Sequence, residues 1–334
     1  YVAKVWAIND YGNGPLSDAT SSFTPIAASV GLFMAGYVGS GPVNIVDKIV
    51  PETAGNAVDF GDTSATKYSG AGFSSDTRSI VAGGYGPSVA LNVIEYFTFA
   101  SAGNATDFGD LSSTAYVSAG FSNNVRGVIA LGYSGGYVNT LEYVTIASTG
   151  NATDFGDASV AERGFAGGLA STTRGVFGGG ENSGKTNVID YVTIASVGNA
   201  TDFGDLTEAR YGPAGASSNT RGIFGGSGSG TYGNVIDYIT IASTGNAIDF
   251  GDTLEVRDML AGLANSTKAI FGGGRNDSGG STTIQQVTIA TTGDATDFGD
   301  LTAAKSFSAG ACSGADAVQN EADFAPAAIG LFGG

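Results

Sequence analysis

The sequence contains no histidine, a single cysteine (Cys312) and far fewer basic than acidic residues, and each shortage excludes a class of function. Without an imidazole there is no histidine general base, no Ser-His-Asp triad and no ordinary zinc or copper site. One cysteine cannot form an internal disulfide. The 14 Lys and Arg residues against 31 Asp and Glu residues give a net charge of −17, which disfavours nucleic acids and anionic membranes as partners because both are polyanions. No apolar run approaches the roughly 20 residues of a membrane span. We therefore expect a protein that is not an enzyme and that holds no cofactor or metal.

Glycine is abundant instead, with 55 residues, while 42% of the residues are hydrophobic and only 7 are proline. This balance is typical of a folded chain and not of a collagenous or disordered one. Much of the glycine belongs to an internal repeat. The phrase Gly-Asn-Ala-x-Asp-Phe-Gly-Asp recurs at steps of 47 or 48 residues, beginning at Gly55, Gly103, Gly150, Gly198, Gly245 and, with aspartate in place of asparagine, Gly293. A period of this length indicates a repeat architecture.

Each repeat resolves into four short strands rich in valine, isoleucine, tyrosine, phenylalanine and threonine. In one copy the strands are expected at 212–217, 222–226, 234–241 and 246–250, separated by glycine and serine. The third strand alternates polar and apolar residues, which is the pattern of β-structure and not of a helix. Four strands in roughly 45 residues, repeated many times, are typical of a β-propeller. We expect an all-β fold of this architecture.

The number of propeller blades depends on how the ring closes. Repeat units are expected at about 22–62, 63–110, 111–157, 158–205, 206–252 and 253–300, with a partial unit at 301–334. If residues 1–21 supply the two strands that the partial unit lacks, the ring has seven blades, and we favour this closure. The alternative is a ring of six blades, closed by a strand at 306–312 beside residues 31–62.

One copy of the repeat resembles the kelch family. The resemblance lies in Leu-Thr-Glu-Ala-Arg-Tyr-Gly-Pro-Ala-Gly-Ala-Ser at 206–217, Arg-Gly-Ile-Phe-Gly-Gly at 221–226 and Val-Ile-Asp-Tyr at 235–238, with their arginine, double glycine and acid-tyrosine pair. Phenylalanines such as Phe203 replace the tryptophan usual in the fourth strand, and the first-strand histidine is missing. The wording Thr-Gly-Asn-Ala-Thr-Asp-Phe-Gly-Asp is similar to kelch-like repeats in large structural proteins of marine tailed phages. That similarity implies a virion structural protein, located on the virion surface or otherwise outside the cell.

The first residues resemble a different family. Tyr-Val-Ala-Lys-Val-Trp-Ala-Ile-Asn-Asp-Tyr-Gly-Asn-Gly-Pro-Leu-Ser at 1–17 is similar to the last two strands of a fibronectin type III domain. Two strands of such a sandwich cannot stand alone. The resemblance implies that residues 1–21 are the remnant of a neighbouring domain and that the chain is part of a longer protein.

Two charged patterns have competing interpretations. Every copy of the repeated phrase ends in two aspartates three residues apart, such as Asp202 and Asp205, which could bind calcium with backbone oxygens. Aspartates also accept backbone N–H bonds in turns, however. Basic residues recur in register at Arg78, Arg126, Arg174, Arg221 and Lys268, and again at Lys67, Arg163, Arg210, Arg257 and Lys305. We therefore expect these cations to pair structurally with the turn aspartates or with third-strand acids such as Asp190 and Asp237.

Residues 179–186 match the phosphate-binding loop of nucleotide-binding proteins letter for letter. That loop needs a following helix, whose N-terminal amides hold the phosphate. A strand is expected from Asn187 instead, so we expect no nucleotide site.

The loop after the double glycine varies most from copy to copy. Its six versions, at 37–43, 85–91, 133–138, 181–186, 227–233 and 275–281, leave equivalent strand ends and should share one face of the disc. They are rich in tyrosine, serine, glycine and asparagine, as antibody binding loops are, although glycine-rich hairpins are also simply good turns. The candidate ligand-binding residues are Tyr37, Tyr85, Tyr133, Tyr137, Asn182, Lys185, Tyr232, Arg275 and Asn276. A second candidate is the segment 314–328, which interrupts the last unit.

Together these features predict a non-enzymatic attachment module of an extracellular assembly, such as a phage tail fibre or a baseplate-associated protein. Its expected ligand is a host-surface glycan or protein, contacted by the tyrosines of one loop face. Further expected partners are other subunits of the virion or surface assembly and copies of the chain itself in a homo-oligomer. The alternatives are a purely architectural spacer or packing domain and a cell-surface adhesin of a bacterium.

Overall fold

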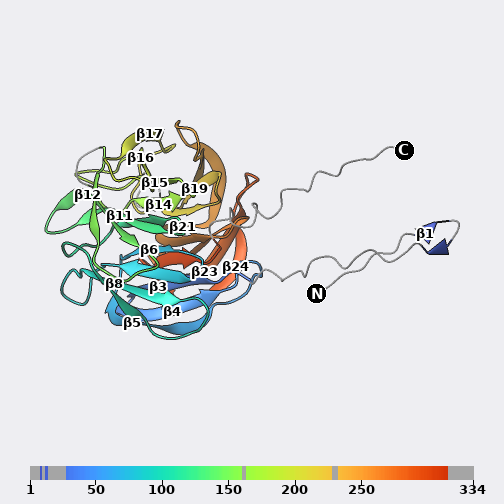
Figure 1. The fold of residues 1–334 in the computed structure, drawn as a ribbon, viewed down its shortest axis with the longest axis horizontal. Coiled ribbons are helices and arrows are strands. Elements are labelled where there is room, and N and C mark those ends of the chain that lie inside the picture. The colour runs from blue at the N-terminus through green and yellow to red at the C-terminus, as the bar shows by residue number, and fades with distance from the viewer. Residues whose placement is uncertain (1–7, 10–11, 14–27, 160–162, 228–231, 315–334) are drawn as a thin grey trace.

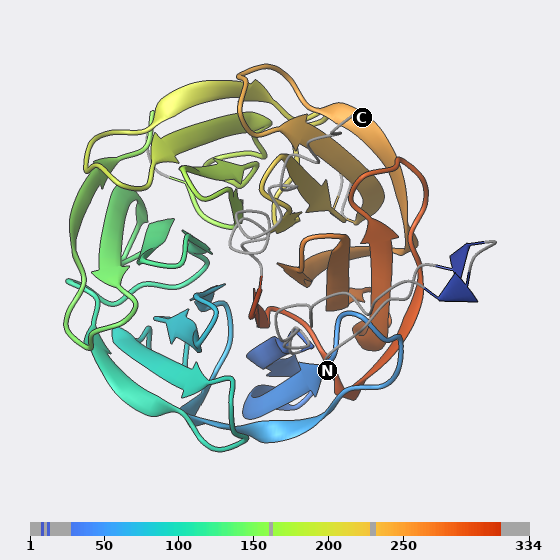
Figure 2. The same ribbon diagram turned by 45° about the vertical axis from the view of Figure 1, so that its right-hand side comes forward.

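The computed structural model describes residues 8–9, 12–13, 28–159, 163–227 and 232–314. These residues form strands and connecting turns and contain no helix, which confirms the prediction of an all-β chain. The strands associate into antiparallel sheets, most of them four-stranded, and successive sheets follow one another around a common axis (Figures 1 and 2).

We number six groups of four strands, called units, in chain order. The first unit consists of β25 (Ala309–Cys312), β3 (Gly31–Val38), β4 (Gly41–Ile49) and β5 (Val58–Lys67). The second consists of β6 (Ala71–Ser74), β7 (Arg78–Ala82), β8 (Val93–Thr98) and β9 (Thr106–Asp110). The third consists of β10 (Ala119–Ser122), β11 (Arg126–Tyr133), β12 (Tyr137–Thr145) and β13 (Thr153–Asp157). The fourth consists of β14 (Gly167–Ala170), β15 (Arg174–Gly178), β16 (Val188–Thr193) and β17 (Thr201–Asp205).

The fifth and sixth units share one long strand and so form a seven-stranded sheet. It contains β18 (Ala214–Ser217), β19 (Arg221–Gly225), β20 (Gly233–Thr240), β21 (Ile248–Ala264), β22 (Lys268–Asn276), β23 (Gly279–Thr288) and β24 (Thr296–Lys305). The start of β21 pairs with β20, whereas residues 258–264 pair with β22. This strand is therefore the fourth strand of one unit and the first strand of the next.

Pairing of β25 with β3 joins the two ends of the described ring. Ala309 lies opposite Met34, and Cys312 lies opposite Gly31. This is the pairing expected of the six-unit alternative. The predicted closure by residues 1–21 and the start of the predicted unit at about 22–62 lie almost wholly outside the described residues. From that segment the structure describes β1 (Ile8–Asn9) and β2 (Gly12–Asn13), which pair with each other.

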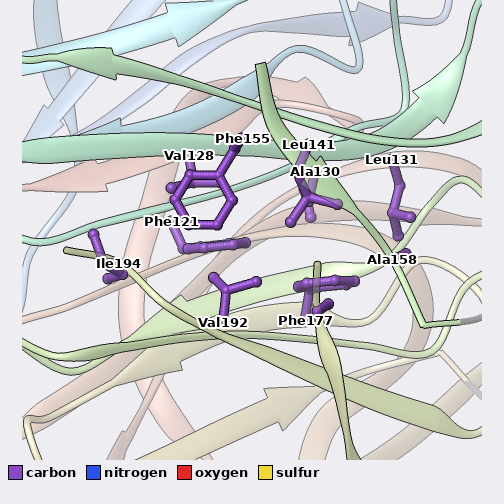
Figure 3. Close-up of a cluster of buried hydrophobic side chains, with 12 residues drawn as sticks. Phe121, Val128, Ala130, Leu131, Leu141, Phe155, Ala158, Phe177, Val192 and Ile194 are labelled. Atoms are coloured by element: carbon purple, nitrogen blue, oxygen red, sulfur yellow. The ribbon is translucent and has the colours of Figure 1, made fainter. Parts of the chain in front are cut away.

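The hydrophobic core lies between neighbouring units. Six buried clusters each draw residues from two successive units, including one that joins Phe33 and Ile49 of the first unit to Ile270 and Phe298 of the sixth. Figure 3 shows the cluster between the third and fourth units, where Phe121 and Phe177 stack with ring centroids 5.8 Å apart. Since a four-stranded sheet cannot bury both faces alone, each unit depends on both neighbours.

Glycines at one register of the first strands permit close approach around the axis. An added Cβ at any of them would lie 2.1 to 2.5 Å from the carbonyl oxygen of the equivalent glycine in the preceding unit. The six residues of this inner glycine ring are Gly72, Gly120, Gly168, Gly215, Gly262 and Gly310. The contacts run full circle, from Gly310 back to Gly262, so a side chain at this register would force two backbones apart.

Candidate functional site on the loop face

The repeated Gly-Asn-Ala-x-Asp-Phe-Gly-Asp phrase fastens each unit to the next. The asparagine side chain accepts the backbone N–H of the last aspartate in the preceding copy, as Asn199 does from Asp157 at 3.1 Å. The glycine N–H of the same copy donates to the carbonyl of Phe155 at 2.8 Å. The side-chain contact recurs at all six junctions, including the donation from Asp300 to Asn56. We call this set of contacts the outer clasp.

One set of cations forms buried ion pairs with third-strand acids, as predicted. The Nη2 of Arg210 lies 2.7 Å from Asp237, and that of Arg163 lies 2.8 Å from Asp190. The equivalent Lys67–Glu95 and Lys305–Asp47 pairs are equally buried. Burial raises the pKa of Asp190 and of Asp237, although the adjacent guanidinium opposes the shift. In the sixth unit the acid is replaced by Gln285, and Arg257 pairs with Glu255 instead.

The other set of cations does not neutralise acids, and the prediction was wrong for it. Arg126 lies over the Tyr143 ring at 4.2 Å and donates to the carbonyl of Ile194 in the next unit at 2.8 Å. Arg78, Arg174 and Arg221 make the same two contacts. The paired turn aspartates take part in none of the ion pairs between described residues. Their backbone is held by the outer clasp.

The loops after the second strands meet the links between units at one face of the ring, which we call the loop face. Tyr85 pairs with Tyr68 of the preceding link, and Tyr133 pairs with Tyr116 in the same way. The links to the second and third units have a residue of positive φ two positions before the first strand, Ser69 and Val117, and the N–H of Val117 donates to the carbonyl of Ser69 at 2.9 Å. Since β-branched residues rarely adopt positive φ, these bonds between links hold a strained backbone in place.

Six tyrosines on the loop face form a continuous row of ring contacts, which we call the tyrosine arc. Successive ring centroids are 5.4, 5.7, 5.0, 5.4 and 5.3 Å apart along Tyr37, Tyr68, Tyr85, Tyr116, Tyr133 and Tyr137. The rings meet edge to face or tilted, an arrangement that aromatic quadrupoles favour. The row spans the first three units. The structure therefore brings together Tyr37, Tyr85, Tyr133 and Tyr137, as the predicted loop face requires.

The tyrosine arc is partly exposed and carries free hydroxyl groups. Tyr37 is 37% exposed and the other five rings are half-buried. None of the six hydroxyl groups has a hydrogen-bond partner among the described residues, and none is a buried atom. Burial, together with the charges of neighbouring tyrosines, raises the pKa of Tyr68 and of Tyr116. The phenols of Tyr68 and Tyr116 are therefore uncharged at neutral pH.

A charged cluster occupies another part of the loop face. The Nε of Arg275 donates to the buried Asp258 carboxylate at 3.0 Å, and Tyr211 donates its hydroxyl to the same carboxylate at 2.8 Å. Burial and the Asp258 carboxylate raise the pKa of Tyr211 to about 12. The guanidinium also lies 4.7 Å from the centre of the Phe307 ring, which in turn contacts Tyr68. The charged cluster and the tyrosine arc are therefore connected through Phe307.

The other predicted residues lie outside the arc. Lys185 lies over the ring of Tyr211 at 5.1 Å. Asn182 is at an exposed turn tip, and the side chain of Asn276 accepts the N–H of Ser278 in its own turn. Tyr232 is half-buried near Asp277 and Arg275. The second predicted candidate, residues 314–328, lies outside the described residues except for Gly314.

A cavity of about 190 Å³ lies on the axis, lined by first strands of all six units. The hydroxyl oxygens of Ser69 and Ser118 line it and are buried without a hydrogen-bond partner among the described residues. Ser69 follows Tyr68 in the chain, so the cavity meets the loop face beside the tyrosine arc. Its lining mixes these hydroxyls with glycine, alanine and apolar side chains such as Phe73 and Met259.

Five residues of the loop face were not among the predicted site residues: Tyr68, Tyr116, Tyr211, Asp258 and Phe307. Four of them lie in the links between units and Asp258 lies at the corresponding position of β21, whereas the predicted residues all belong to the loops after the double glycine. The sequence does vary from copy to copy at this position of the repeat. It is tyrosine at 68, 116 and 211, and glycine, aspartate or serine in the other three units. That variation is of the same kind as in the loops.

The described residues contain no group of three or more acidic, cysteine or histidine side chains able to hold a metal ion. No helix among them could cross a membrane. The strand β16 follows the phosphate-loop-like residues 179–186, as predicted, where a nucleotide site would need a helix. Comparison of the chain with family models and with curated proteins finds no match.

Proposed function

We propose that the chain is a six-bladed β-propeller of kelch-like repeats that serves as a non-enzymatic attachment module. The propeller is supported by six four-strand units, six core clusters each shared by neighbouring units, and an inner glycine ring whose contacts run full circle. Six blades are favoured over seven because β25 supplies the first strand of the first unit.

The attachment surface in this proposal is the loop face. The observation that carries it is the tyrosine arc, since half-buried rings with free hydroxyls gather where the six units differ from one another. Rigid amphipathic tyrosines provide contact area at low entropy cost, and loops on a rigid scaffold commonly carry binding sites. The ligand is a host-surface glycan or protein.

The setting is an extracellular assembly, and the similarity of the repeats to those of marine phage structural proteins favours a virion appendage. Several copies of the chain in such an assembly would raise the strength of attachment without any new contact, because binding of one copy increases the effective concentration of the others.

A pair of surface variants tests this proposal. The first replaces Tyr85, Tyr116 and Tyr133 with serine on the loop face, and the second replaces the exposed Val125 and Val197 with serine on the opposite face. Binding of the fluorescently labelled chain to a panel of bacterial cells should be lost in the first variant and kept in the second. Equal binding by the first variant and the original chain, or binding of the original chain to no cell, would overturn the proposal.

The architectural alternative makes the opposite prediction. If the ring is a spacer, neighbouring subunits cover its loop face in the assembly, and the tyrosines are protected from solvent. Footprinting of tyrosines on intact particles by hydroxyl radicals distinguishes the two, because only an attachment face leaves Tyr37 and Tyr85 reactive.

A further inference from the structure

The tyrosine arc has a composition that restricts its ligand. Its six rings follow one another in single file over three units, and none of its members carries a charge at neutral pH. We propose that the arc binds an extended, uncharged oligosaccharide whose sugar residues lie along the rings from Tyr37 towards Tyr137. This inference rests on the proposed function of the loop face and names its ligand.

The spacing of the rings suits a chain of sugars. Each step between neighbouring centroids is 5.0 to 5.7 Å, which is about the size of one six-membered ring. Neighbouring ring planes are turned by 50 to 87°, so a pyranose can pack its apolar C–H face on the face of one tyrosine and meet the edge of the next. A row of several rings therefore selects a chain over a single sugar.

The free hydroxyl groups suit the same ligand. A sugar presents hydroxyls around the edge of its ring, and each needs a hydrogen-bond partner when water is displaced. The phenol hydroxyls of the arc can both donate and accept, and they are not engaged by other described residues. Tyr211, by contrast, already has Asp258 and Arg275 as partners and lies outside the arc.

The charge of the chain disfavours an acidic ligand. The chain has a net charge of −17, so its field repels polyanions. The cation connected to the arc, Arg275, already pairs with the carboxylate of Asp258, which is fully buried. An acidic sugar would have to compete with that carboxylate, whereas an uncharged sugar meets no such opposition.

Titration calorimetry of the whole chain tests the inference. The probes are uncharged glucose and galactose oligomers of increasing length and their uronic-acid counterparts. Affinity for an uncharged series should rise with length, and Tyr116→Ala should weaken binding of the longest oligomer at least tenfold, about 1.4 kcal/mol. Tyr116→Phe keeps the ring and should lose much less. Val125→Ala, on the opposite face, should change nothing, and thermal unfolding confirms that each variant is folded.

The possible failures are distinguishable. Preference for uronic-acid oligomers that Arg275→Gln removes would overturn the inference, as would binding of no oligomer at all. If cell binding still depends on the loop-face tyrosines in either case, the attachment function stands and the ligand is an acidic glycan or a protein. If cell binding is also independent of these tyrosines, the proposed function fails as well.

Discussion

The outer clasp and the loop face belong to the same six units, yet they vary very differently. At the clasp five of the six junctions use the same asparagine contact, and the sixth uses Asp294 in its place. At the loop face, the repeat position that is Tyr68 in the first link holds tyrosine, glycine, aspartate or serine in the different units. The difference follows from packing, because the clasp must fit its neighbour at every junction, whereas the link position contacts loops that differ from unit to unit. A position free of that constraint can be used for recognition.

The largest effect is expected at the inner glycine ring. Gly215→Val would place a Cβ 2.1 Å from the carbonyl oxygen of Gly168 and should cost about 5 kcal/mol or abolish folding. Chemical denaturation measures the loss. Gly103→Ala is the matched control, because no atom lies within 4 Å of the added Cβ, and it should change stability by less than about 0.5 kcal/mol. Similar losses in both variants would contradict close packing at the axis.

A smaller effect is expected at a buried ion pair. Asp237→Asn leaves the fully buried Arg210 without its counter-ion and should cost about 3 kcal/mol, because an unpaired buried charge is strongly unfavourable. Glu255→Gln is the comparison, because Glu255 pairs with Arg257, the sixth-unit equivalent of Arg210. Its pair with Arg257 is partly exposed, so the cost should stay below about 1 kcal/mol. Equal costs would show that burial of the pair does not matter.

Substitutions in the outer clasp should change the stability of the fold in both directions, one lowering it and one raising it. Asn199→Ala removes the acceptor for the Asp157 N–H and should cost about 1 kcal/mol. Asp294→Asn restores the common residue and removes a negative charge that, with burial, raises the pKa of Asp252. It should add about 0.5 kcal/mol of stability. Thermal unfolding measures both, and destabilisation by Asp294→Asn would contradict this account.

The last effect appears only at high pH and is expected on the loop face, at Tyr211. Its pKa is raised to about 12 in the folded chain, against about 10 in an unfolded one. A raised pKa stabilises the fold while the hydroxyl is protonated, so this contribution is complete below pH 10 and is lost as the pH rises towards 12. The original chain should lose more stability over that interval than Tyr211→Phe. Parallel denaturation curves at each pH test this, and identical losses would contradict it.

The sequence predicted the strands well because each repeat shows its pattern six times. Alternation in 234–241 and glycine at its borders are local signals, and β20 was found almost at its true limits. The closure of the ring, in contrast, cannot be predicted from local sequence patterns. The strand at 306–312 could serve a six- or a seven-unit ring, and its pairing with β3 depends on a partner far away in the chain.

The site was predicted only in part for a related reason. The tyrosines of the hairpin loops were found because these loops vary, but Tyr68 and Tyr116 reach the same row from links that precede the first strands. Their proximity follows from the return of the chain to the loop face after each fourth strand. Likewise, Arg126 and Arg210 have the same charge, yet one lies over tyrosine and the other meets an acid, which their spacing alone did not distinguish.

The pairing of β25 with β3 has a consequence for how the chain folds. The sheet that contains β3 lacks one strand until β25 has been synthesised. The first unit therefore cannot form completely before the end of the described chain is made. Such distant pairing slows folding. Once formed, it also means that no single unit can detach without breaking two interfaces, so unfolding should be slow as well. Such a ring would owe its persistence to a high kinetic barrier against opening.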